Sequence, residues 1–402
     1  MTNKSTEIEM NKPKEQILTK RLVLLMSITC GLAVANLYYN QPLLADMGRT
    51  FHANSRQVGN ISMFTQIGYA IGMFLFVPLG DMRERRQLIT ILLVAVTVSL
   101  VGVAVAQNLP WIYMASLAVG ITTVVPQVII PLAAQMAEPL QRGKVIGSVM
   151  SGLLFGILLA RTVSGFIGGS FGWRTMYCIA AVLMLALAVI LRSFLPKSYP
   201  EATLTYRQVL KSLGMLIKTQ PTLREASLVG ALLFGSFSVF WTSLAFYLEG
   251  NPYYFGSQVT GLFGLVGVVG AAAAPFVGRL ADRFSPKFMV GLFIFITFLS
   301  YLFFGFLGST IWGLVIGVIL LDLGVQGAQV SNQTRIYSLV PEARSRINTV
   351  FMVTYFLGGS LGSSLGSYAW SMWKWQGVCT AGGTLIVLGF IIWWVHRIKK
   401  NT

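Results

Sequence analysis

The sequence predicts an all-α integral membrane protein, with twelve transmembrane helices in two pseudo-symmetric six-helix bundles. Three observations support this fold class. Of the 402 residues, 55% are hydrophobic and only 11% are charged, whereas a soluble domain carries about 25% charged residues. Twelve apolar runs are long enough to cross a bilayer. A short loop around Asp81 has a counterpart around Asp282, and such an internal repeat indicates two halves built alike.

The apolar runs give the predicted helices in chain order. A spanning helix needs about 20 predominantly apolar residues. The runs that meet this length are 22–46, 57–80, 87–107, 109–137, 145–170, 173–195, 222–249, 258–280, 287–308, 310–334, 345–370 and 375–397. The connections are short except for the segment from about 196 to 221, in which Leu204–Ile217 is predicted to form an amphipathic helix on the membrane surface.

The basic residues predict the orientation. With the N-terminus inside, 25 of the 30 Lys and Arg residues lie in inner segments and four in outer loops, while Arg161 lies within a helix. Cytoplasmic loops carry this excess, so both termini are expected in the cytoplasm. The predicted organisation is an N-terminal tail (1–21), a six-helix bundle (22–195), a cytoplasmic linker (196–221), a second six-helix bundle (222–397) and a C-terminal tail (398–402).

Several function classes are excluded by the sequence. The net charge of +17 is spread over short loops, which argues against nucleic acid binding and for membrane orientation. Cys30, Cys178 and Cys379 lie far apart in apolar runs, so neither a disulfide nor a metal site is expected. No Gly-x4-Gly-Lys-Ser/Thr pattern for ATP and no nucleophile constellation is visible, so we expect neither a cofactor nor enzymatic activity.

The repeat extends beyond the opening loop. Glu138 and Arg142, after the fourth predicted helix, are matched by Glu342 and Arg346 after the tenth. The two halves therefore have the same orientation, and we expect an axis along the membrane normal to relate them.

With twelve helices and this repeat, the chain resembles the major facilitator superfamily, whose loop pattern is Gly-x3-Asp-Arg/Lys-x-Gly-Arg/Lys-Arg/Lys. The second copy matches it at Gly278, Asp282, Arg283 and Lys287, and the first keeps Asp81, Arg85 and Arg86. The resemblance implies a monomer in a bacterial inner membrane that transports by alternating access. It also implies a cytoplasmic gate, formed by charge pairs among Asp81, Arg85, Arg86, Asp282 and Arg283. The alternative is that these positive charges only set the membrane topology, and the two roles are compatible.

Two further stretches resemble drug:proton antiporter members of this superfamily. One is Asn36–Pro42. The other is a fifth-helix pattern of small residues, at which this chain has Ser151, Ala160, Ser164, Gly165, Gly168 and Gly169. Small residues at this spacing let helix backbones approach closely. The pattern fits either ordinary helix packing or the tight seam between halves that the antiporter signature implies.

Two charged residues lie deep in predicted helices. A charge there costs about 2.5–3.5 kcal/mol on insertion scales, so each is a functional candidate. Asp322, near the midplane of the tenth helix, is the proton-coupling candidate, because burial favours the neutral carboxyl group. The alternative is a structural aspartate. Arg161, in the fifth helix, stays charged and is the candidate to bind an anionic substrate or to pair with Asp322; a fixed structural role is the alternative.

Polar and aromatic residues within the helices suggest a central cavity for an amphipathic molecule. For any single residue, hydrogen bonding between helices or anchoring at the membrane interface is the alternative. The candidates are Asn36, Tyr39, Asn40, Gln66, Tyr69, Gln127, Trp241, Tyr247, Gln326, Gln329 and Tyr355. Asp46 and Glu249, at outer helix ends, are expected to be solvated. His52 and His396 have no partner pattern for metal or catalysis.

The sequence thus predicts a secondary active transporter in the lipid bilayer that exports a small organic or drug-like molecule in exchange for protons. The alternative is a proton symporter or facilitator that imports a sugar or organic anion, with Arg161 holding the anion. A non-transporting membrane sensor is a third class, and it would call for an appended signalling domain.

Overall fold

The computed structural model describes residues 18–80, 82–138, 140–198, 205–280, 285–340 and 343–398, with only the backbone described at 271–280 and 397–398. Within these residues the chain is helical and forms no strand. The helices are α1 (Lys20–Ala35), η1 (Gln41–Leu43), α2 (Leu44–Phe51), α3 (Ser55–Gly80), α4 (Arg85–Ala104), α5 (Leu109–Thr122), α6 (Val125–Met136), α7 (Arg142–Phe171), α8 (Trp173–Phe194), α9 (Tyr206–Thr219), α10 (Pro221–Glu249), α11 (Ser257–Leu280), α12 (Pro286–Leu307), α13 (Ile311–Tyr337) and α14 (Arg344–Ile398).

The helices account for twelve membrane passes. Nine stretches of the described chain are long and apolar enough to cross a membrane, and one of them joins α5 and α6. Helix α14 supplies two passes, because Lys374 has a non-helical backbone (φ 52°, ψ −142°) and reverses the chain. A straight helix of its 55 residues would be about 80 Å long, against a hydrocarbon core of about 30 Å. Helices α1 and α11 complete the twelve, so the predicted fold class is confirmed.

The first predicted helix is interrupted, and the prediction of a continuous helix over 22–46 was wrong. Helix α1 ends at Ala35, residues 36–40 form turns, and a short 3-10 segment leads into α2. Pro42 contributes to the break, because proline has no N–H group to donate to the carbonyl four residues earlier and its ring crowds that carbonyl. The break in the helix places the Tyr38 ring and the Gln41 side chain against the side chain of Arg161.

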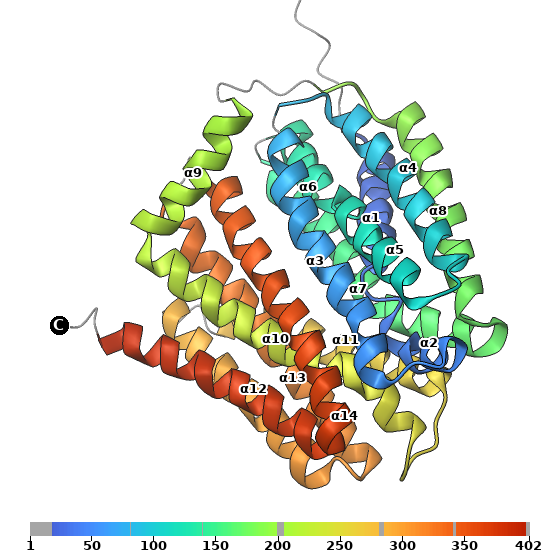
Figure 1. Ribbon diagram of the computed structural model, residues 1–402. Helices are drawn as coiled ribbons and strands as arrows, with labels where there is room; N and C mark the ends of the chain where they lie inside the picture. The colour runs from blue at the N-terminus through green and yellow to red at the C-terminus, as the bar shows by residue number, and fades with distance from the viewer. Residues whose placement is uncertain are drawn as a thin grey trace, which may run out of the picture.

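The two halves lie side by side, with α1–α8 in one and α10–α14 in the other (Figure 1). Helix α9 in the linker confirms the amphipathic helix predicted there; it begins at a capping box of Thr205 and Gln208 and buries Val209, Leu213 and Leu216. It contacts α3 of one half and both α10 and α14 of the other. "Inner" and "outer" below refer to the orientation that the loop charges predict.

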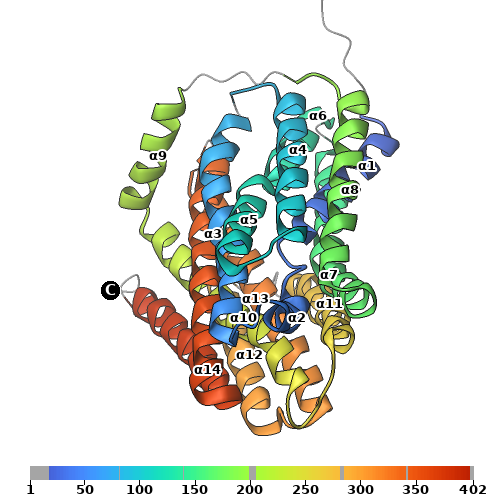
Figure 2. The ribbon, with the colours of Figure 1, turned by 45° about the vertical axis from the view of Figure 1, so that its right-hand side comes forward.

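The halves meet along two helix pairs, α3 with α14 and α7 with α11 (Figure 2). Glycines permit the close approach. A Cβ atom on Gly59 of α3 would collide with the side chain of Ser367 of α14, and one on Gly261 of α11 would lie 2.7 Å from the Arg161 carbonyl oxygen. The contact between α7 and α11 brings Arg161 of one half to the face of the other.

Candidate functional site

Arg161 is the buried cation at the centre of the protein. Its side chain projects from α7 and is 1% exposed. The Nε atom donates a hydrogen bond to Oε1 of Gln41 at 2.6 Å. The guanidinium carbon lies 4.0 Å from the ring centroid of Trp241 and 4.9 Å from that of Tyr38. Its Nη1 and Nη2 atoms have no hydrogen-bond partner among the described residues, so this edge is free to bind another group.

Asp322 is the buried anion of the same site, and it comes from α13 of the other half. It is 1% exposed, and neither carboxylate oxygen has a hydrogen-bond partner in the described chain. Glycines of α11 make room for it, since a Cβ atom on Gly267 would lie 3.1 Å from Oδ2. Arg161 and Asp322 interact electrostatically. They do not form an ion pair in this structure, because no guanidinium nitrogen lies within 4.0 Å of a carboxylate oxygen.

Trp241 lies between these two charges. Its ring stacks on the Arg161 guanidinium, and its indole N–H lies near the Asp322 carboxyl without the geometry of a hydrogen bond. Buried polar groups are nearly always hydrogen-bonded. The neighbouring side chains of Arg161, Asp322 and Trp241 all keep buried atoms without a hydrogen-bond partner. This is the strongest indication of a binding site in the described chain.

An aromatic wall surrounds the charges. Phe234 stacks on Tyr355 with ring centroids 4.1 Å apart, and Tyr69 from the other half lies 4.5 Å from Phe356. Phe237 lies 5.4 Å from the Arg161 guanidinium. Such a wall suits a ligand with an apolar body.

Several predicted cavity residues form side-chain hydrogen bonds across the halves or to tyrosines of the aromatic wall. Gln66 donates to Ser363 Oγ across the halves at 3.1 Å, and Gln127 donates to the Tyr69 hydroxyl at 3.2 Å. The Tyr355 hydroxyl donates to Gln329 at 3.2 Å. Both side-chain polar atoms of the buried Asn36 lack partners among the described residues.

Other predicted cavity residues lie elsewhere. Asn40 bonds with Ser62 and Thr65 of α3, inside the first half. The Tyr247 hydroxyl donates to the Gly308 carbonyl, at the outer ends of the second half. Tyr39 is buried and interacts with Tyr177 of α8. Gln326 is half-buried on α13.

Tyr38, Gln41 and Phe237 contact Arg161 and were absent from the predicted set. For Tyr38 and Gln41 a signal existed, because both lie in the Asn36–Pro42 stretch that resembles efflux members. Phe237 has no distinguishing mark among many phenylalanines.

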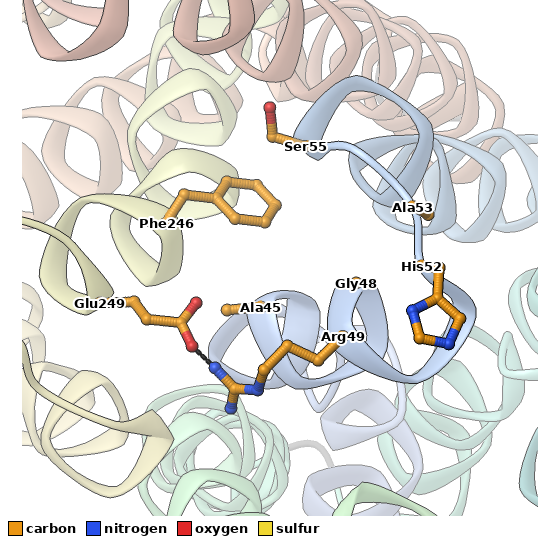
Figure 3. Close-up of a pocket in the computed structure, with 8 residues that line it drawn as sticks. All are labelled: Ala45, Gly48, Arg49, His52, Ala53, Ser55, Phe246 and Glu249. Atoms are coloured by element: carbon orange, nitrogen blue, oxygen red, sulfur yellow. Dashed lines mark ion pairs between the residues drawn. The ribbon is translucent and has the colours of Figure 1, made fainter.

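The outer ends of the halves are joined by charge. Arg49 of α2 forms ion pairs with Asp46 and with Glu249 of α10. Glu249, expected to be solvated, thus bridges the halves. A hollow of about 520 Å³ lies beside this pair, and His52, Ser55 and Phe246 are among its lining residues (Figure 3). None of the predicted cavity residues lines it.

The small-residue pattern of α7 is divided between two environments. Gly165 faces the Ser257 carbonyl oxygen and Gly261 of α11, and Gly169 faces Gln258. Gly168 faces Leu43, and both Ala160 and Ser164 are buried. Ser151, near the inner end, is exposed. The outer part of the pattern therefore belongs to the seam between halves.

Substitution of Gly165 by Leu should prevent closure of this seam, because a Cβ atom there would meet α11 backbone. The measurement uses protein that lacks the three native cysteines and carries a cysteine in place of the buried Ser257. We expect this cysteine to react with an impermeant maleimide several-fold faster when Gly165→Leu is present than when it is absent. Gly147→Leu is the control, since a Cβ atom on Gly147 of the same helix meets nothing within 4 Å in the described structure. Equal labelling of both variants would contradict the assignment.

The predicted cytoplasmic gate is described only in part, because Asp81, Asp282 and Arg283 lie outside the described residues. Arg85 Nε donates to the Gly80 carbonyl at 2.8 Å, and Arg86 donates to the Leu195 carbonyl at 3.3 Å. These arginines join inner helix ends within the first half.

A buried charge cluster lies at the inner ends of the second half. Arg335 of α13 forms a two-pronged ion pair with Glu225 of α10, and it also donates to Asn332 at 3.0 Å. His396 of α14 lies 3.6 Å from Glu225 Oε2. This cluster was not predicted from the sequence, because its members come from three helices far apart in the chain.

Comparison with known proteins decides the family. The profile described as Major Facilitator Superfamily matches residues 26–331 and 255–402. The chain belongs to this superfamily. It is therefore a membrane transporter and not an enzyme, as predicted.

Superfamily relatives cover nearly the whole chain. It is 41% identical to the Uncharacterized transporter YgaY of Escherichia coli O157:H7 over 390 residues, which are 96% of this chain and 99% of that protein. It is 32% identical to the Probable transporter SCO4007 of Streptomyces coelicolor over 367 residues, covering 91% and 85% respectively. Among solved structures, a bacterial homologue of the human lysosomal transporter Spinster, inward-facing and occupied, has a TM-score of 0.72 at 14% identity, covering 93% and 96%; this likeness concerns the fold alone.

Proposed function

We propose that this superfamily member exports a small organic molecule in exchange for protons, with Asp322 as the proton carrier. One observation carries the proposal: the Asp322 carboxyl is buried beside the other half of the protein, and both of its oxygens lack partners in the described chain. A structural aspartate in such a place would be hydrogen-bonded. A carboxyl group that alternates between a proton and a substrate must instead keep its oxygens available.

In the proposed cycle, the substrate site opens in turn to each side of the membrane. The outer seam, with the Arg49–Glu249 ion pair and the close contact of α7 with α11, is suited to open and close as a unit. Ion pairs that exist in one conformation bias the equilibrium between two. We include in the proposal an inner gate built from Asp81, Arg85, Arg86, Asp282 and Arg283, which opens when the outer seam closes. The electrical part of the proton gradient contributes about 2.3 kcal/mol per charge per 100 mV.

The proposal includes the oligomeric state, the membrane and the orientation of the protein. We infer a monomer in the bacterial inner membrane, with the tails 1–21 and 398–402 and the linker 196–221 in the cytoplasm, and bundles at 22–195 and 222–397. The excess of basic residues in the inner segments supports this orientation.

The second candidate is import of an organic anion, by proton symport or facilitated diffusion. It is favoured by Arg161, whose Nη1 and Nη2 atoms are buried and free of hydrogen bonds in the described structure. In this case Arg161 holds the anion, and a proton on Asp322 balances its charge.

The test uses inside-out vesicles that contain the protein and hold a preset pH gradient. Lipophilic cations, neutral drugs, sugars, organic acids and amino compounds are added one at a time, and the lumenal pH is followed. Proton efflux on addition of a compound supports the antiporter. Proton movement with the compound supports the symporter. Counterflow of a labelled solute without proton movement would leave a facilitator, with Asp322 in a structural role.

A further inference from the structure

We propose that the substrate is a zwitterion, whose carboxylate binds Arg161 and whose ammonium group binds Asp322. This inference rests on the proposed function, in that it takes this site to be where the substrate binds. It adds the chemical class of the substrate.

The Arg161 side of the site is shaped for a carboxylate. Gln41 holds the guanidinium through Nε, and the rings of Trp241 and Tyr38 fix its plane. The remaining edge carries Nη1 and Nη2, which are buried and have no partner in the described chain. Two parallel N–H donors on a fixed plane match the two oxygens of a carboxylate.

The Asp322 side is shaped for a cation. The carboxyl group packs against Gly267 and Gly270 of α11, and its two oxygens are buried and free of hydrogen bonds within the described residues. An ammonium group brings three donors, which can satisfy these oxygens. A proton can occupy the same oxygens when the substrate has left.

Charge balance separates a zwitterion from a singly charged ligand. Arg161 and Asp322 belong to different halves and do not form a direct ion pair in this structure. An anion alone would need a proton on Asp322 to balance the site, which gives symport and not the proposed exchange. A cation alone would leave Arg161 unpaired. An unpaired buried charge costs several kcal/mol. A molecule with both charges satisfies both residues at once, and it also links the two halves.

The surrounding rings indicate the rest of the molecule. Phe237, Trp241 and Tyr355 lie around the charged pair, so the body of the ligand is expected to be apolar or aromatic. The class is therefore an amino acid or a related amino carboxylate with an apolar side group. Its ammonium group competes with the proton for Asp322, which is the coupling that an antiporter requires.

The experiment measures thermal stabilisation of the purified protein, because a ligand that binds the native state raises its Tm. The probes are two zwitterions with different charge spacing, phenylalanine and 4-amino-3-phenylbutanoate. Phenethylamine and 3-phenylpropanoate each keep one charge. We expect at least one zwitterion to stabilise the wild-type protein at a concentration at least tenfold lower than either singly charged compound, a difference of about 1.4 kcal/mol or more.

Variants assign each charge to its partner. Arg161→Gln should lose the preference for the zwitterion over the amine, and Asp322→Asn should lose the preference for the zwitterion over the acid. Arg142→Gln, at an exposed position of the same helix as Arg161, is the matched control and should behave like the wild type.

Two results would overturn the inference: the amine or the acid stabilises the wild type as well as the zwitterions do, or neither zwitterion stabilises it. If a different compound then drives protons in the vesicle assay, the antiporter proposal stands without the zwitterion. If a zwitterion binds but no compound moves protons, the antiporter proposal fails and the substrate class stands.

Discussion

Asp322→Asn is expected to abolish substrate-driven proton movement, down to the level of vesicles without the protein. Asparagine has nearly the same shape as aspartate but cannot accept and release a proton at physiological pH. The measurement is lumenal pH in inside-out vesicles on addition of an active compound. Glu138→Gln, which neutralises an exposed carboxylate, is the control and should keep full activity.

The stability of the same variant distinguishes a carrier from a structural residue. If Asp322 were mainly the structural counter-charge of Arg161, its neutralisation would leave a buried arginine unpaired and cost about 3–5 kcal/mol. Its oxygens have no hydrogen-bond partner in the described structure, and it acts on Arg161 without a direct ion pair, so we expect Asp322→Asn to lose clearly less stability than this. Normal coupled transport in this variant, or a large loss of stability, would refute the carrier role.

The fold could be predicted because the membrane constrains the sequence strongly. Every spanning helix must be about 20 apolar residues long, so the apolar runs along the sequence locate the passes. Asp322 and Arg161 were identifiable for the same reason, because a charge within an apolar helix stands out against its surroundings. Their joint placement at one site depends on packing between the halves, which no local pattern contains.

What the sequence did not reveal depends on contacts between distant segments. Gln41 reaches Arg161 only because the helix breaks at residues 36–40, and the apolar run hides this break. Glu249 and Arg49 lie about 200 residues apart in the chain and meet at the outer seam. A charge near a helix end is usually solvated, so its partner becomes visible only in three dimensions.

Glu225→Gln is expected to have the largest effect on stability. The side chains of Glu225 and Arg335 are 3% and 8% exposed, and they form a two-pronged ion pair between α10 and α13. Removal of one partner leaves the other charge buried and uncompensated. We expect the free energy of unfolding to fall by about 3–5 kcal/mol, measured by chemical or thermal denaturation of the purified protein.

The double variant Glu225→Gln/Arg335→Met tests whether this loss comes from the unpaired arginine. Replacing a whole buried ion pair by neutral groups is often nearly neutral for stability, so the double variant should recover most of the loss. Asn332 and His396 would each lose a charged partner in the double variant, so recovery is expected to be incomplete. If the double variant were less stable than Glu225→Gln alone, the pair would have to contribute through its specific geometry. The account based on an uncompensated charge would then be wrong.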